Sequence, residues 1–277
     1  MSELVEIRVQ DGVADVRLNR PDKYNALSPE MFSAIIAAGE SLAKRNDVRA
    51  VVLSGNGPGF CSGLDFASFQ GMSDSGGVEA ATTGEATNSS ALARDSEHPD
   101  NRAQRPAFVW KRMPVPVIAA IHGVAYGGGL QVALGADIRI ATADAKLSVM
   151  EIKWGLVPDM GLTQTIRDLV RLDVAKELTF SGRIVSGEEA CQLGLVTRVS
   201  ADPLADALKM AQEIAARSPD AIRAGKQLLD ASWHADAHAG LRLEASLQTA
   251  LIGTPNQLEA IHANFEKRAP RFADPAA

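Results

Sequence analysis

The chain has 277 residues, of which 46% are hydrophobic, so it can bury a sizeable core as one large domain or as a domain with an appendage. Its formal net charge of -6, without a dominant basic run, argues against a general binder of nucleic acid or of anionic membranes. Cys61 and Cys191 give no disulfide framework, and the apolar residues 115–121 are far fewer than the roughly 20 that span a bilayer. Because no secretory leader precedes the first strand-like run, we expect a cytoplasmic protein with no membrane or nucleic-acid partner.

The first part of the chain predicts a hairpin and then a helix. Residues 4–9 and 13–18 alternate between apolar and polar side chains about Asp11-Gly12, a dipeptide typical of two-residue hairpin turns. Ser28 is a favoured N-cap residue, and the apolar spacing after it continues to about Arg45. The chain therefore opens with two antiparallel strands and one amphipathic helix.

Two glycine-rich turns are the most informative features that follow. The first covers residues 54–65 after the apolar strand 51–53, and the second covers residues 122–131 after the apolar run 115–121. Brought together, two such turns can point two peptide N–H groups at one oxygen. A donor placed where negative charge develops in a transition state contributes about 3 kcal/mol, so the pattern indicates an enzyme that stabilises an oxyanion.

Two later regions differ from this alternation of strand and helix. Residues 70–105 are rich in glycine, serine, alanine, threonine and charge, so they form either a disordered surface insertion or a lid-like segment. Ser186 and Glu189 have the spacing of a helix capping box. Beyond residue 200 the apolar spacing predicts a mostly helical part, with helices over residues 204–216, 219–233 and 238–251.

In their order along the chain, these motifs resemble the signatures of the crotonase (enoyl-CoA hydratase/isomerase) superfamily. Residues 51–65 are similar to its first signature and residues 117–129 to its second. Shorter likenesses extend the resemblance over nearly the whole chain, at residues 18–27, 194–199 and 265–268.

The resemblance implies an α/β fold, a crotonase-like spiral of ββα units over residues 1–200 that holds the CoA-thioester site. It also implies a flexible insertion at about 70–105 beside the acyl end of the pocket. The helical region 201–277 would mediate assembly into a homotrimer or a dimer of trimers. The partner would be an acyl-CoA thioester substrate, so we expect no cofactor beyond the coenzyme A that the substrate carries.

The same resemblance assigns roles to particular residues of the predicted site. The backbone N–H groups of Leu64 and Gly128 would form the oxyanion hole for a thioester carbonyl. Glu151 and Asp159 match the glutamate and aspartate with which the dienoyl-CoA isomerase branch moves protons along a conjugated chain. Contacts to the substrate and its nucleotide end carry over to five residues, namely Lys23, Ala26, Ser62, Asp65 and Gln131.

Gln131 departs from the family pattern, because the best-known hydratases carry a glutamate there and the dienoyl-CoA isomerase branch usually carries an aspartate. An amide can orient a water or a substrate oxygen, but it cannot act as a general acid or base. We therefore expect isomerisation of an enoyl- or dienoyl-CoA in preference to hydration. Three alternatives remain: an enoyl-CoA hydratase using Glu151 alone, an aromatic acyl-CoA dehalogenase-like hydrolase using Asp159, and a non-catalytic CoA-ester-binding protein.

Chemistry of other classes receives less support from the sequence. Residues 59–63 have the G-x-C-x-G form of a nucleophile elbow, which would indicate an α/β-hydrolase with Cys61 and a distant His262, but the elbow should follow its strand directly. Phe60 occupies the third-glycine position of the dinucleotide pattern, so no nicotinamide cofactor is indicated. The five histidines lack metal-ligand spacing, so we expect no metal site.

Overall fold

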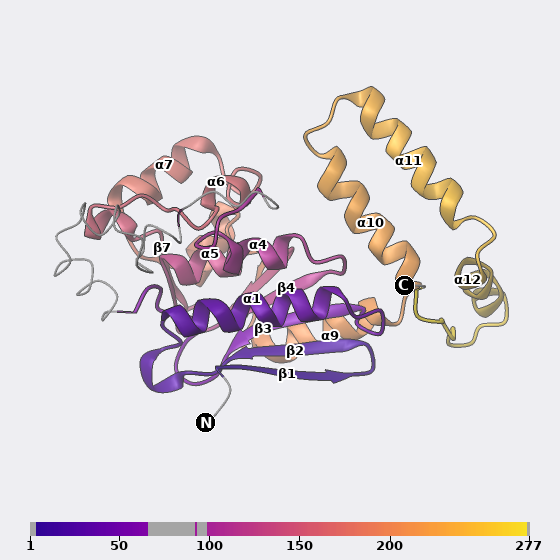
Figure 1. Ribbon diagram of the computed structural model, residues 1–277, viewed down its shortest axis with the longest axis horizontal. Coiled ribbons are helices and arrows are strands. Elements are labelled where there is room, and N and C mark those ends of the chain that lie inside the picture. The colour runs from indigo at the N-terminus through magenta and orange to yellow at the C-terminus, as the bar shows by residue number, and fades with distance from the viewer. Residues whose placement is uncertain (1–3, 66–91, 93–98, 276–277) are drawn as a thin grey trace.

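A six-stranded sheet forms the body of the protein (Figure 1). The computed structural model describes residues 4–65, 92 and 99–275, so the predicted insertion at 70–105 falls mostly outside the described residues. The first two strands pair antiparallel, and all other neighbours in this sheet are parallel. The strands lie in the spatial order β1 (Val5–Gln10), β2 (Val13–Leu18), β3 (Ala50–Gly55), β4 (Val117–Ile121), β6 (Ile138–Ala141) and β9 (Arg198–Val199).

A smaller sheet and several short helices complete the body. The sheet consists of β5 (Val124–Tyr126), β7 (Lys146–Ser148) and β8 (Val185–Ser186). The helical segments of this part are η1 (Pro21–Lys23), α4 (Arg105–Lys111), α5 (Gly128–Leu134), η3 (Glu151–Trp154), α6 (Leu162–Thr165), α7 (Leu172–Ser181) and α8 (Gly187–Leu193). This mixed arrangement confirms the α/β class predicted from the sequence.

Local sequence signals account for the first elements. Asp11 and Gly12 both have positive φ, 49° and 79°, as a tight two-residue hairpin turn requires, and the predicted hairpin is confirmed. Ser28 caps α1 (Pro29–Ala43) by accepting a hydrogen bond from the N–H of Met31 at 3.3 Å. The helix ends two residues before the expected Arg45.

The central strands are buried on both faces, and each face is covered by helices. All six residues of β3 are buried. One face packs against α9 (Pro203–Ala215), whose Ala207, Ala211 and Ala215 recur every fourth residue and form a core cluster with strand residues. Because alanine side chains are small, this helix lies close to the sheet. The predicted helix at 204–216 is therefore part of the body.

Three further helices extend away from the body towards the C-terminus (Figure 1). They are α10 (Pro219–Ser232), α11 (Ala237–Leu251) and α12 (Pro255–Phe265). The first two confirm the helices predicted over 219–233 and 238–251, while α12 was not predicted. Every residue of α11 is described, and none is buried in the single chain. In the described part of the chain, no helix is long and apolar enough to cross a bilayer.

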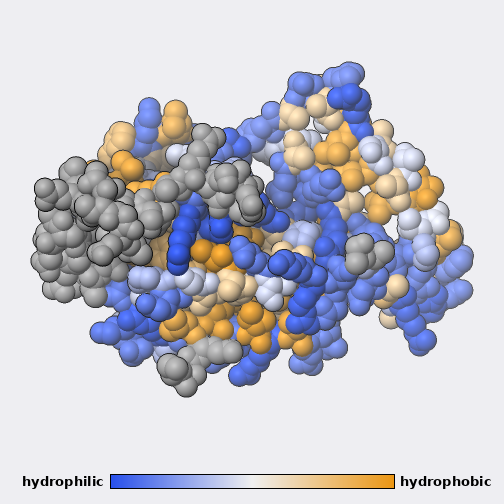
Figure 2. All heavy atoms as spheres, in the orientation of Figure 1, coloured by the Kyte–Doolittle hydropathy of each residue, from blue (hydrophilic) through white to orange (hydrophobic). Residues whose placement is uncertain are grey.

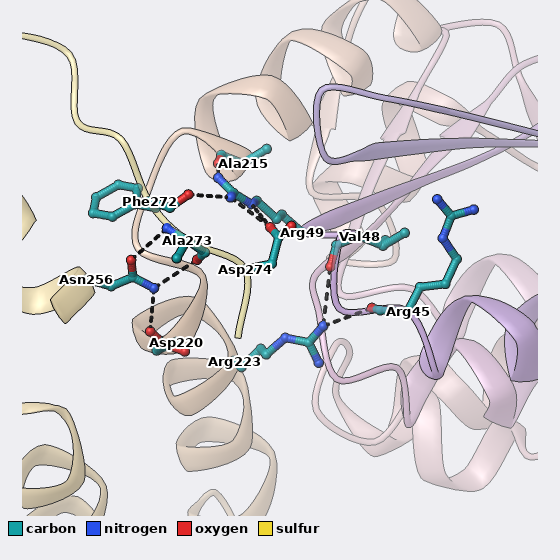
Figure 3. A network of polar contacts seen from close by, with 10 residues as sticks. All are labelled: Arg45, Val48, Arg49, Ala215, Asp220, Arg223, Asn256, Phe272, Ala273 and Asp274. Carbon is teal, nitrogen blue, oxygen red and sulfur yellow. Dashed lines mark hydrogen bonds and ion pairs between the residues drawn. The ribbon is translucent and has the colours of Figure 1, made fainter. Parts of the chain in front are cut away.

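Arg49 connects the C-terminal segment to the body (Figure 3). Its guanidinium donates to the carbonyl oxygens of Ala215 at 3.2 Å and of Phe272 at 3.0 Å, and it pairs with Asp274 at 2.8 Å. Since Ala215 is the last residue of α9, one side chain joins the sheet-covering helix to the end of the chain. The segment around Asp274 is thereby held against the body.

A second set of contacts joins the same segment to α12, and joins α10 to both α12 and the body (Figure 3). Asn256, at the start of α12, exchanges hydrogen bonds with the backbone of Ala273 at 2.9 and 3.0 Å and donates to Asp220 of α10 at 2.7 Å. Arg223 of α10 donates to the carbonyl oxygens of Arg45 and Val48 at 3.2 and 3.3 Å. The helices are therefore fixed to the body at two separate points.

Candidate active site

The two glycine-rich turns lie side by side, as the sequence predicts. Cys61 of the first turn forms a parallel bridge with Ala125 of the second. In this bridge the N–H of Cys61 donates to the carbonyl of Val124, and the N–H of Tyr126 donates to the carbonyl of Cys61, both at 3.0 Å. The first turn therefore runs along β5 as an added strand.

Glycine is required where the turns touch. Gly63 has a φ of 87°, and a Cβ there would lie 2.6 Å from the carbonyl oxygen of Tyr126 and 3.6 Å from the nitrogen of Gly128. A Cβ on Gly129 would lie 2.4 Å from the carbonyl oxygen of Cys61. Any other residue would separate the turns, since real Cβ atoms do not approach so closely.

The backbone N–H groups of Leu64 and Gly128 are both available at this contact. Leu64 lies opposite Leu27 in a parallel bridge. The N–H of Leu27 donates to the carbonyl of Gly63 at 2.8 Å, and the N–H of Asp65 donates to the carbonyl of Leu27 at 3.1 Å. In this pattern the N–H of Leu64 points away from Leu27. Gly128 is the first residue of α5, where an N–H has no partner within the helix. Neither N–H donates to a backbone carbonyl in the described part of the chain. Near the Gly63–Gly128 contact, two backbone donors therefore have no backbone acceptor among the described residues.

Asn25 holds the first turn in shape, and sequence reasoning did not identify it. Its fully buried Nδ2 donates to the carbonyl oxygens of Asn56, Gly59 and Phe60 at 3.0, 2.9 and 3.1 Å. Its Oδ1 accepts from the N–H of Arg20 at 2.8 Å. These bonds keep three turn carbonyls directed inward. Its place in the motif at 18–27 was the available signal, but the three carbonyl groups that its Nδ2 contacts lie more than 30 residues away along the chain.

Glu151 lies against the second glycine turn, at the start of η3. A Cβ on Gly127 would lie 3.3 Å from its Oε1, which also accepts a hydrogen bond from Nε2 of Gln131 at 2.6 Å. Its Oε2 is buried and has no hydrogen-bond partner among the described residues. Burial raises the pKa of Glu151, the negative charge of Asp159 adds to the rise, and hydrogen bonds from the backbone and Gln131 oppose it. This carboxyl is therefore a better proton acceptor than an exposed one.

Gln131 is almost completely buried, and it joins Glu151 to the segment that follows Asp159. Its Oε1 accepts from the backbone N–H groups of Met160 at 2.9 Å and Leu162 at 3.2 Å, while its Nε2 faces Glu151. Both ends of the amide are therefore hydrogen-bonded to other parts of the protein. The contact between Gln131 and substrate that the sequence predicts stays a prediction.

Asp159 lies next to this bridge, just before Met160. The residue is exposed in the single chain, yet desolvation by the atoms around its carboxyl raises its pKa, against an opposing backbone hydrogen bond. Its negative charge raises the pKa of Glu151, so the two carboxyl groups interact electrostatically. The structure therefore brings together both carboxyl groups that the sequence singled out, one on a half-buried residue and one on an exposed residue.

The four residues expected at the nucleotide end gather around the first turn. Lys23 is exposed at the end of η1, and its carbonyl accepts from the hydroxyl of Ser62 at 3.4 Å. Ala26 is buried, and Asp65 pairs with Arg20, whose guanidinium also donates to the Ala26 carbonyl at 3.3 Å. Arg20 was not among the predicted site residues. Its charge is compensated by Asp65, so its role here is to hold the loop together.

The structure argues against Cys61 as a nucleophile. Complete burial raises the pKa of its thiol to about 12, so it stays protonated at neutral pH. Its Sγ donates to the carbonyl oxygen of Asn25 at 3.1 Å, which makes it part of the turn packing. Among the described residues, no group of three His, Cys, Asp or Glu side chains is placed to hold a metal ion.

Known proteins with similar sequences and structures share this architecture. The sequence model of the family described as enoyl-CoA hydratase/isomerase matches residues 8–275. Enoyl-CoA hydratase domain-containing protein 2, mitochondrial, of Mus musculus is 34% identical over 96% of this chain and 88% of its own length. Delta(3,5)-Delta(2,4)-dienoyl-CoA isomerase, peroxisomal, of Arabidopsis thaliana is 32% identical over 98% of this chain and 96% of its own. The crystal structure of an enoyl-CoA hydratase from Bacillus anthracis superposes with a TM-score of 0.84 at 29% identity, covering 97% of this chain and 98% of the other.

These similarities cover nearly the whole chain, and they agree with the two touching glycine turns and the parallel sheet. The predicted crotonase-like fold is confirmed. The relatives include both hydratases and isomerases. The chain therefore belongs to the enoyl-CoA hydratase/isomerase family, within the crotonase superfamily.

Proposed function

We propose that this protein isomerises an enoyl- or dienoyl-CoA thioester, with proton transfer by Glu151 and Asp159 and enolate binding by the N–H groups of Leu64 and Gly128. One observation supports this most. The buried Glu151 carboxyl, with one oxygen unpartnered among the described residues, lies against the same glycine turn that offers the Gly128 N–H. A base next to an oxyanion site is what enolate formation requires.

The proposed reaction moves one proton off the acyl chain and returns one at another carbon. One carboxylate accepts a proton from a carbon conjugated to the thioester, and the electron pair of that C–H bond moves through the double bonds to the carbonyl oxygen. The two N–H groups bind the resulting enolate oxygen, each contributing about 3 kcal/mol. The other carboxyl, protonated, then donates to a different carbon. The raised pKa values make both carboxyl groups better proton acceptors than exposed carboxyl groups.

The nucleotide end of the thioester would bind around the first turn. Lys23 supplies an exposed positive charge there, and Arg20, paired with Asp65, holds the same loop together with Ser62 and Ala26. Coenzyme A enters as part of the substrate in this proposal, so no separate cofactor takes part. Lys23→Ala should weaken binding of CoA esters without unfolding the protein, and unchanged affinity would remove Lys23 from the site.

Rates of Glu151→Gln and Asp159→Asn on separate substrates test the proton transfer. A 2-enoyl-CoA reports water addition, and a 3,5-dienoyl-CoA reports isomerisation. We expect Glu151→Gln to lose both activities by about 100-fold or more, and Asp159→Asn to lose isomerisation by about 100-fold, because general acid–base groups contribute about that much. Asp173→Asn, at an exposed ion pair on α7, is the matched control. Wild-type isomerisation in Asp159→Asn would exclude it from the mechanism.

Hydration by Glu151 alone is the second candidate. The contrast between the half-buried Glu151 and the exposed Asp159 favours it, since only the former is held against the glycine turn. In that case Asp159→Asn would keep full water addition and the dienoyl substrate would not react. Binding of CoA esters without turnover of any enoyl, dienoyl or aromatic thioester would instead favour the non-catalytic alternative.

We also propose that the C-terminal helices mediate a homotrimer or a dimer of trimers. Figure 2 shows apolar residues on the surface of the α10–α11 pair. Trp233, Leu241 and Phe265 are 67%, 63% and 83% exposed in the single chain, a large apolar surface for a protein on its own. Sedimentation at several concentrations tests this, and a monomer at all of them would contradict it.

A further inference from the structure

The amide of Gln131 has only one possible orientation. Its Oε1 lies 2.9 Å from the backbone nitrogen of Met160 and 3.2 Å from that of Leu162. Both nitrogens are donors, so the atom between them must be the acceptor oxygen and not the NH2 group. The NH2 group is thereby directed at Oε1 of Glu151, 2.6 Å away.

This orientation gives the two oxygens of Glu151 different chemistry. An amide NH2 group donates and cannot accept, so Oε1 of Glu151 must remain an acceptor while the bond is kept. A proton carried by Glu151 then resides preferentially on Oε2, because a protonated Oε1 would accept the bond from Gln131 only weakly. That oxygen is buried and has no hydrogen-bond partner among the described residues.

We propose that Gln131 is a positioning residue that directs proton transfer by Glu151 to Oε2 and stabilises the ionised form of Glu151. This inference rests on the proposed function, because it concerns the base of that reaction. Gln131, which replaces a glutamate of the two-glutamate pattern, thus acts through Glu151. Gln131 itself exchanges no proton.

The same amide also aligns the oxyanion turn with the base. The segment it holds carries Met160, whose side chain packs onto Gly128: a Cβ on Gly128 would lie 2.6 Å from Sδ of Met160. Gln131 follows Gly128 by three residues on α5, so one short helix connects the free N–H and the amide. Loss of the amide would affect both the carboxyl and the packing over the oxyanion turn.

The direction of the pH effect follows from the groups that face Glu151. Desolvation and the charge of Asp159 raise its pKa, while the backbone and Gln131 hydrogen bonds lower it. Asp159 is the charged side chain of the described residues that acts on it. Without the Gln131 donor, desolvation and the charge of Asp159 would raise the pKa of Glu151 further. On acidification, Glu151 would then become protonated at a higher pH than in the wild type. A base that works in its ionised form then loses activity at a higher pH as well.

Gln131→Met tests the proposal, because methionine has a similar length and forms none of the three hydrogen bonds of the Gln131 amide. In the acidic range we expect kcat/KM to fall about tenfold, recovering towards the wild-type value at alkaline pH, since a hydrogen bond to a charged group has about that effect. KM should change much less than kcat. A purely structural defect would lower the whole pH profile without moving its acidic limb. Gln164→Met, at an exposed position of α6, is the matched control.

Gln131→Glu provides a second, nearly isosteric variant. Two carboxylates 2.6 Å apart cannot both be ionised, so the pair would share one proton. The protonated partner then donates to Glu151 as the amide does, so the acidic limb of this variant should stay at or below the wild-type pH. This variant keeps the test decisive if the methionine variant does not fold. The proposal is overturned if the acidic limb stays at the wild-type pH in folded Gln131→Met, or moves up in pH in folded Gln131→Glu.

A readout without turnover separates this proposal from the proposed function. In protein labelled with 13C at the glutamate carboxyl carbons, the resonance missing from Glu151→Gln identifies Glu151, and its titration gives the pKa directly. We expect the midpoint to rise in Gln131→Met. An unchanged midpoint overturns the role of Gln131 even in an active enzyme. A raised midpoint in a protein that turns over no enoyl- or dienoyl-CoA supports the hydrogen bond and rejects the proposed reaction.

Discussion

Replacement of Asn25 by aspartate removes the hydrogen-bond donor of the first glycine turn while keeping its shape. Nδ2 of Asn25 is fully buried and lies within 3.1 Å of the carbonyl oxygens of Asn56, Gly59 and Phe60. In aspartate an oxygen replaces Nδ2, so a carboxylate oxygen would face three carbonyl oxygens without a hydrogen between them. Each buried polar group left unsatisfied costs about 1–3 kcal/mol, and we expect Asn25→Asp to lose about 3–5 kcal/mol in free energy of unfolding at about pH 7.

The loss should depend on pH in one direction. A buried carboxyl that faces carbonyl oxygens has a higher pKa in the folded state than in the unfolded state. Its contribution to stability is therefore fully present below the unfolded pKa and is lost as pH rises through the folded pKa. When protonated, the side chain of Asn25→Asp donates one hydrogen bond again. The deficit should shrink between about pH 7 and about pH 5.

Urea denaturation at these two pH values measures both effects. Asn264→Asp is the matched control, because Asn264 is exposed and donates only to the Ala260 carbonyl within its own helix among the described contacts. Turnover of the thioester should fall together with stability, since the same turn carries the Leu64 N–H. A free energy of unfolding within about 0.5 kcal/mol of the control at both pH values would refute this account of the turn.

Three other expectations follow from burial and charge. Glu151→Gln should be more stable than the wild type at alkaline pH. The pKa of Glu151 is raised in the folded state, so its contribution to stability is lost as pH rises through that pKa. Thermal unfolding at about pH 5 and pH 8 measures this, and an equal difference in stability between variant and wild type at both pH values would contradict it. Iodoacetamide should modify Cys191 well before Cys61 in the folded protein, because burial raises the pKa of Cys61 to about 12; equal rates by peptide mass spectrometry would argue otherwise. Arg49→Met should speed proteolysis of the C-terminal segment by about tenfold without unfolding the sheet, and an unchanged rate would show that the Asp274 contact is not needed.

Local signals explain why much of the fold could be predicted. Asp11-Gly12 and Ser28 act on their immediate neighbours, so the hairpin and the start of α1 follow from a few adjacent residues. The capping box at Ser186 is confirmed in its first half: the hydroxyl accepts from the N–H of Glu189 at 3.0 Å. The side chain of Glu189 pairs with Arg183 instead of returning to the cap, a partner that sequence spacing did not identify.

Residues whose partners are distant could not be assigned in the same way. Asn25 reaches three carbonyls across the first turn, and the pairing of Arg20 with Asp65 joins residues 45 positions apart. The sequence identified Glu151 and Asp159 as a pair but could not say which would be buried. It marked Gln131 as a departure from a pattern, whereas its bridging role depends on the backbone of the segment after Asp159. Such roles need coordinates because they come from packing between segments.

The C-terminal helices are attached to the body at both ends, through Arg223 at their start and through Arg49 at the end of the chain. A helical arm joined to a body at a single connection can swing about that connection. Here Arg223 fastens the arm near its root, and the returning chain is fastened again beside Arg49. The helices should therefore keep a fixed angle to the sheet in the single chain.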